Sequence, residues 1–125
     1  MKKKSFIYVP FIKEGYHRYP EAKTHPSLAT GDQYDVSHLG ERHFHYFYFK
    51  VFIEVKHTNR DIELIQFRRW LESLYSEKQL EVDYKSVEMM ADDLYEKISK
   101  RYPDREIRID VSEDNINGTV VEYQP

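Results

Sequence analysis

Residues 44–55 read F-H-Y-F-Y-F-K-V-F-I-E-V and form the strongest β-strand signal in the chain. Successive side chains of a strand point to opposite faces of a sheet, so the odd positions share one face and the even positions share the other. The odd face, from His45 to Val55, is almost wholly apolar, and the even face is aromatic with charges. This double pattern predicts a strand that is covered on both of its sides.

The residues before this strand contain a second strand signal and a long irregular segment. Residues 5–18 alternate like a strand that is interrupted at Pro10 and Gly15, and proline there indicates an edge or a bulge. Residues 19–42 contain prolines and glycines and have no sustained period. We therefore expect a strand region followed by a long loop at about 19–42.

The residues after the strand predict two helices and a terminal hairpin. Apolar residues recur at helical spacing over 61–75, and again from Val87 onward with Ser86 as a plausible N-cap. Short alternating runs at 107–112 and 119–123 predict two paired strands. Strands and helices do not alternate singly, so the order predicts one α+β domain with an antiparallel sheet.

Composition excludes several classes of protein. The chain has 125 residues, no cysteine and a net charge of −3. The lack of cysteine excludes a disulfide scaffold, a thiolate zinc finger, an iron–sulfur cluster and a cysteine nucleophile. The charge argues against a nucleic-acid or membrane partner, and no apolar run approaches the ~20 residues of a membrane span. We expect a cytoplasmic protein, and keep as a weaker alternative an interaction domain that uses the lysines at 2–4 and exposed aromatics.

Three histidines predict a metal site. His43 and His45 lie two positions apart, so both imidazoles lie on one face of the predicted strand. Two such rings can converge on one ion, and His17, at the end of the first strand region, is the natural third ligand. Three imidazoles leave one position of a tetrahedral ion open for catalysis. The alternative is that these histidines are ordinary residues at the ends of strands.

Glu113 is the second informative position. The alternation of Ile107, Ile109 and Val111 places Glu113 in phase with the apolar face. An inward carboxylate is costly unless a partner satisfies it, and it can accept the two parallel N–H groups of a guanine- or pterin-like edge. The alternative is that the strand ends at Ser112 and that Glu113 begins a solvated turn.

Four stretches of the chain, taken in order, resemble the motifs of one family, with Tyr19 where leucine is usual and Phe44 in place of a glycine. They are residues 15–19 (G-Y-H-R-Y, compared with H-x-L), 42–46 (R-H-F-H-Y, with H-G-H-N-Y), 86–91 (S-V-E-M-M-A, with P-T-x-E-N-L) and 111–118 (V-S-E-D-N-I-N-G, with S-E-T-x-x-x-G). The set resembles the 6-pyruvoyl tetrahydropterin synthase / 6-carboxytetrahydropterin synthase family.

The resemblance implies a fold and an assembly. The family has the T-fold, a four-stranded antiparallel sheet with two helices on one face. Its subunits form trimeric barrels, often stacked as hexamers, with sites between subunits. We therefore expect residues 1–125 to form one T-fold-like domain that assembles into a homo-oligomer.

The resemblance also implies a zinc-dependent lyase that acts on 7,8-dihydroneopterin triphosphate or a related pterin. His17, His43 and His45 would bind zinc, and Glu113 would anchor the pterin ring. Ser86 would lie among the substrate-binding residues.

The proton-transfer groups depart from the family pattern. The family's usual base is a cysteine before the H-G-H motif, and this chain has none. His38 and Glu41 lie in that neighbourhood and are candidates for the base. Asp83 is the nearest match to the aspartate of the family's L-D-H motif, with Tyr84 in place of the histidine. The alternative function is a pterin- or purine-binding module of the same fold that is catalytically altered.

Overall fold

The aromatic strand lies at the centre of the sheet. In the computed structural model, which describes residues 1–125, it forms β2 (His43–Val55). β1 (Ser5–His17) pairs with it antiparallel over its whole length, and β4 (Ile107–Glu113) pairs antiparallel on its other side. Neither Pro10 nor Gly15 interrupts β1, so the expected break in this strand is wrong. Pro10 pairs with Lys50 within the β1–β2 register and Gly15 with His45.

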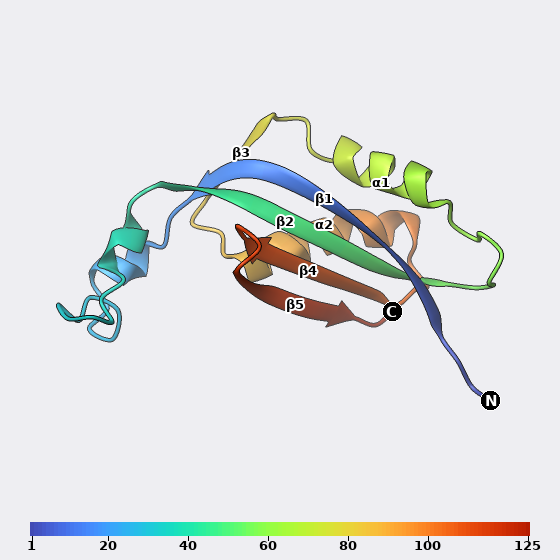
Figure 1. The fold of residues 1–125 in the computed structure, drawn as a ribbon, viewed down its shortest axis with the longest axis horizontal. Helices are drawn as coiled ribbons and strands as arrows, with labels where there is room; N and C mark the ends of the chain where they lie inside the picture. Colours follow the sequence, from blue (N-terminus) through green and yellow to red (C-terminus); the bar gives the residue numbers. More distant parts are fainter.

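Two shorter strands form the edges of the sheet. β5 (Asn117–Tyr123) pairs antiparallel with β4, and β3 (Gln79–Asp83) pairs in parallel with β1. The sheet is therefore mixed and five-stranded, in the order β3-β1-β2-β4-β5, and it is open (Figure 1). The expectation of four antiparallel strands is wrong because β3, which has only five residues, carries too little alternation to be recognised without its partner.

Both helices pack on one face of the sheet. α1 (Leu64–Ser73) begins after Glu63, whose side chain accepts from the backbone N–H groups of Ile65 and Gln66. α2 (Val87–Arg101) begins after Ser86, which caps it as predicted by accepting from Met89 N. The helices and the odd positions of the long strands share one apolar core, whose members are Val9, Phe11, Phe47, Phe49, Val51, Ile53, Ile62, Phe67, Leu71, Leu80, Val87, Met90, Ala91, Leu94, Ile98, Ile107, Ile109 and Val111. No helix of the chain is long and apolar enough to cross a membrane.

The opposite face of the sheet has no helix over it. Phe44 and Tyr46 of β2 are 37% and 47% exposed, and Tyr8 of β1 is 54% exposed. The prediction that β2 is covered on both sides is therefore wrong for the single chain. An aromatic face of this kind accounts for the double pattern in the sequence without a second layer of helices.

The segment at 19–42 leaves the end of β1 and returns at the start of β2. It extends beyond the end of the sheet in Figure 1 and contains two short 3-10 helices, η1 (Pro20–Lys23) and η2 (Ser37–Gly40). Ala22 and Gly40 are buried where these two turns pack together. The predicted long loop is therefore present, with local order of its own.

Candidate metal centre

The inward face of the sheet changes from apolar to polar at one end. β1 ends there at His17, β2 begins there at His43, and β4 ends there at Glu113. The register pairs His17 with His43, and it places Glu113 opposite Phe47, two residues beyond His45. Because all four polar residues are in phase with the buried positions of their strands, their side chains point to the side that the helices cover.

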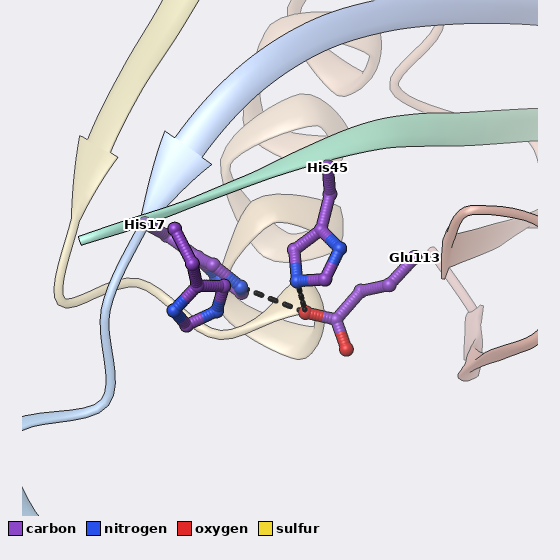
Figure 2. Close-up of side chains that lie close together, drawn as sticks. His17, His45 and Glu113 are labelled. Atoms are coloured by element: carbon purple, nitrogen blue, oxygen red, sulfur yellow. Dashed lines mark ion pairs between the residues drawn. The ribbon is translucent and has the colours of Figure 1, made fainter. Parts of the chain in front are cut away.

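The four side chains converge on one point. One nitrogen of each histidine and one carboxylate oxygen of Glu113 all lie within 4.8 Å of one another. Glu113 Oε2 lies 2.7 Å from His17 Nε2 and 3.1 Å from His45 Nε2, and Figure 2 shows both rings directed at this oxygen. The ring of His43 lies 4.6 Å from that of His17 and 4.9 Å from that of His45, between centroids. The predicted trio of imidazoles is brought together, and the predicted inward carboxylate faces it.

Each histidine is held through its other ring nitrogen. His17 Nδ1 lies 3.0 Å from the carbonyl oxygen of Lys85, and His43 Nδ1 lies 2.8 Å from that of Glu41. A carbonyl oxygen can only accept, so these Nδ1 atoms carry the proton and donate it. His45 Nδ1 lies 2.7 Å from Asp114 Oδ2 in the same arrangement. In the neutral rings the lone pairs are therefore on Nε2, directed into the cluster.

The surroundings of the Nε2 atoms of His17 and His45, the two nearest to Glu113, indicate that the site fits a cation. Both atoms are buried and have no hydrogen-bond partner, although the carboxylate oxygen is in contact. A nitrogen lone pair and a carboxylate oxygen repel unless a positive charge lies between them. Neutral imidazoles with Nδ1 anchored, joined by one carboxylate, form a donor set that suits Zn²⁺ and related transition metals. The residues present therefore fit a divalent metal ion.

The pKa values of His17, His43 and Glu113 describe how protons are held in the cluster when no metal ion is bound. Burial lowers the pKa of His17, but the Glu113 carboxylate and the Lys85 carbonyl outweigh it and raise that pKa above its ordinary value. Burial lowers the pKa of His43. Contact with His17 lowers the pKa of Glu113 and outweighs burial, which would raise it. A proton on His17 and the negative charge of Glu113 stabilise each other, and a metal ion would replace that proton.

The cluster opens into a cavity of about 730 Å³ between the end of the sheet and the start of α2. Four of the residues predicted for the site contribute to its wall: His17, His43, Ser86 and Glu113. The rest of the wall comes from the 19–42 segment and from residues around the N-terminus of α2, namely Arg18, Tyr19, Pro20, Glu21, Leu39, Tyr84, Lys85, Val87, Glu88 and Met89. The volume lies within the range of small-molecule sites, which is roughly 300–1,000 Å³.

The three residues predicted for proton transfer lie outside this wall. His38 is exposed in η2, and the side chain of Glu41 forms an ion pair with Lys23. Asp83 has a left-handed backbone, with φ of 52°, and its carboxylate lies 2.6 Å from Arg18 Nε. Within one chain none of the three lines the cavity, and their catalytic roles stay predictions.

Two contributors to the site were not anticipated from the sequence. Asp114 accepts a hydrogen bond from His45 Nδ1. The sequence offered only the alternative of a solvated turn that begins at Glu113, and only the adjacency of Asp114 to Glu113 could have suggested more. Lys85 acts on His17 through its backbone carbonyl, and a backbone atom leaves no sequence signal. Its side chain forms an ion pair with Asp93 of α2 instead.

Comparison of the chain with protein-family models finds no match, and a search of curated proteins finds no relative that matches.

Proposed function

We propose that this chain is a metal-dependent, pterin-processing lyase similar to the 6-pyruvoyl and 6-carboxytetrahydropterin synthases. The observation that carries the proposal is the convergence of His17, His43 and His45 with Glu113 at the end of a cavity of about 730 Å³. The order of the four motifs along the chain adds support, since each contributes a residue to this one place.

The residues divide the work by their chemistry. The histidines would hold the ion through Nε2, and a bound divalent ion would acidify ligand hydroxyl groups and the C–H bonds beside them. The free oxygen of the Glu113 carboxylate would accept N–H groups from the edge of the heterocycle. In one chain this carboxylate also contacts two of the imidazoles. Where it anchors the ring instead, the three imidazoles would hold the ion and leave its fourth position open for a ligand hydroxyl.

The charges of the cavity bear on the substrate. Its two cationic side chains, Arg18 and Lys85, already form ion pairs with Asp83 and Asp93. A triphosphate that entered the cavity of one chain would have to compete with these carboxylates. We propose the pterin ring and its hydroxylated side chain, more than the phosphates, as the part of the substrate that this cavity recognises.

Assembly into a trimer or hexamer is part of the proposal. The sheet is open, so the outer edges of β3 and β5 have no partner strand, and the face opposite the helices exposes aromatic side chains. Both are features that a closed barrel of subunits would cover. Light scattering of the purified protein tests this directly, and a monomer at micromolar concentration would contradict it.

Metal analysis tests the first part of the proposal. We expect about one zinc per chain in the purified protein, and a large loss of metal after His45→Ala. Turnover of 7,8-dihydroneopterin triphosphate, followed by separation of pterin products, tests the second part. Protein that is metal-free both before and after the substitution contradicts the proposed metal centre.

A binding module of the same fold is the second candidate, and one observation favours it. Cysteine is absent from the chain, and within one subunit His38, Glu41 and Asp83 do not line the cavity. Calorimetry with neopterin and with guanine, set beside a turnover assay, separates the two functions. Binding that requires Glu113 but gives no product supports the module, whereas product formation supports the lyase.

A further inference from the structure

Asp114 is fixed beside the cluster by three hydrogen bonds. Its Oδ2 lies 2.7 Å from His45 Nδ1, and its Oδ1 accepts from the backbone N–H of Tyr46 at 2.8 Å. Its own N–H donates to the carbonyl oxygen of Tyr46 at 2.8 Å. The residue has a left-handed backbone with φ of 56°, which directs its side chain back over β2 after Glu113 has ended β4. Both oxygens of the carboxylate are therefore engaged by donors on one strand.

The bond to His45 differs in kind from those made by the other two rings. His17 and His43 donate to neutral backbone carbonyls, of Lys85 and Glu41 respectively. His45 alone donates to a carboxylate, whose negative charge strengthens the hydrogen bond. A carboxylate in this position holds the ring in the tautomer with the proton on Nδ1 and makes Nε2 a stronger donor to a metal ion.

We propose that Asp114 is a positioning residue of the metal centre, which acts through His45 by holding its Nε2 unprotonated and directed at the ion. The inference rests on the metal centre of the proposed function and is independent of the organic substrate. Because Glu113 and Asp114 are adjacent, the turn after β4 brings one carboxylate to the metal side of His45 and a second one to its far side.

The substitution Asp114→Asn isolates this role with almost no change in size. An asparagine side chain offers one acceptor and one donor, whereas two donors, Tyr46 N–H and His45 Nδ1–H, face the carboxylate. If the amide oxygen stays on Tyr46, the amide N–H faces His45 and favours the tautomer with the proton on Nε2. If the amide turns over, it opposes the Tyr46 N–H instead. Either orientation weakens the arrangement that presents the lone pair to the metal.

The matched control is Asp110→Asn. This residue lies on β4, where its carboxylate accepts from Arg108 Nε at 2.9 Å, and it contacts no residue of the cluster. The same chemical change is thus made on a neighbouring residue outside the site.

The experiment measures zinc affinity by chelator competition in the full chain, together with the tautomer of His45 by nitrogen NMR after chelator treatment. We expect Asp114→Asn to weaken zinc binding by about 10- to 100-fold, the usual effect of removing such a partner, and Asp110→Asn to change it less than threefold. In the unsubstituted protein, NMR should find the proton of neutral His45 on Nδ1.

The outcomes separate the two proposals. If the unsubstituted protein binds no zinc, the proposed metal centre fails and this inference fails with it. If it binds zinc and Asp114→Asn binds equally well, only the role of Asp114 is overturned. Should the variant fail to fold, as judged by circular dichroism, the tautomer in the unsubstituted protein decides, and a proton found on Nε2 overturns the role.

Discussion

Zinc should raise the thermal stability of this protein, and His45→Ala should remove most of the effect. Tetrahedral zinc with bonds of about 2.0–2.1 Å holds its ligand atoms about 3.4 Å apart. The four candidate ligand atoms already lie within 4.8 Å of one another, so binding requires only small side-chain rotations. The folded chain thus presents a nearly formed site that the unfolded chain lacks, and ligand binding to the folded state alone stabilises that state.

The size of the effect follows from linkage. At a free zinc concentration 100 times the Kd, folding gains about 2.7 kcal/mol. A chain of 125 residues has an unfolding entropy of about 0.26 kcal/mol per kelvin, so the expected rise in Tm is about 10 °C. If the loss of one ligand weakens binding about 100-fold, the same zinc concentration contributes only about 0.4 kcal/mol, or roughly 1–2 °C.

Calorimetric melts of chelator-treated protein, with and without zinc, provide the measurement. His25→Ala is the control, because His25 is exposed in the 19–42 segment and its side chain bonds only the neighbouring Ser27. It should keep the full zinc-dependent shift. A shift below about 2 °C in the unsubstituted protein, or an equal shift in the His45→Ala variant, would refute the reasoning.

Three further results are expected. In metal-free protein the destabilisation caused by Glu113→Gln, measured by urea melts across pH, should be greatest between pH 4.5 and 6.5. The lowered pKa of Glu113 stabilises the folded state above the ordinary pKa of 4.5, and this contribution is lost as the pH falls. The raised pKa of His17 stabilises the folded state below the ordinary pKa of 6.5, and this contribution is lost as the pH rises. A flat profile would contradict the ion pair. Gly118→Ala should destabilise the protein by about 1–3 kcal/mol in the same melts, because a Cβ at this position would overlap the backbone of β4, which cannot move cheaply. An unchanged urea midpoint would show that β4 and β5 separate easily. Calorimetry should find 7,8-dihydroneopterin bound within tenfold of its triphosphate, since Arg18 and Lys85 are already paired, and a much tighter triphosphate would mean that cations from another subunit reach the cavity.

Much of the fold was predictable because its signals are local. The alternation of β2, the helical spacing after Ser86 and the hairpin at the end of the chain all involve residues close in sequence, and all are present. The parallel strand β3 was not predicted, because its identity depends on pairing with β1, more than 60 residues away in the register that joins Glu14 to Gln79. Local alternation over five residues is too weak to indicate a strand by itself.

The candidate site divides in the same way. The spacing of His43 and His45 and the phase of Glu113 were sufficient to predict that these side chains point to the covered face of the sheet. The three proton-transfer candidates were placed by resemblance to motifs, and their side chains lie outside the cavity of one chain. Asp114 was missed because its role depends on a left-handed turn that brings it back over β2.

The sequence alone determined which residues have the chemistry for the site and on which face of each strand they lie, since these follow from residue type and from the twofold period of a strand. Only the tertiary structure decided that His17 lies opposite His43 and that Glu113 reaches both Nε2 atoms. The tertiary structure also decided which oxygen atoms accept the hydrogen bond from the Nδ1 of each histidine ring. The physical reason is that strand register and backbone hydrogen bonds are set by the packing of segments far apart in the chain, and a carbonyl oxygen has the same chemistry in every residue.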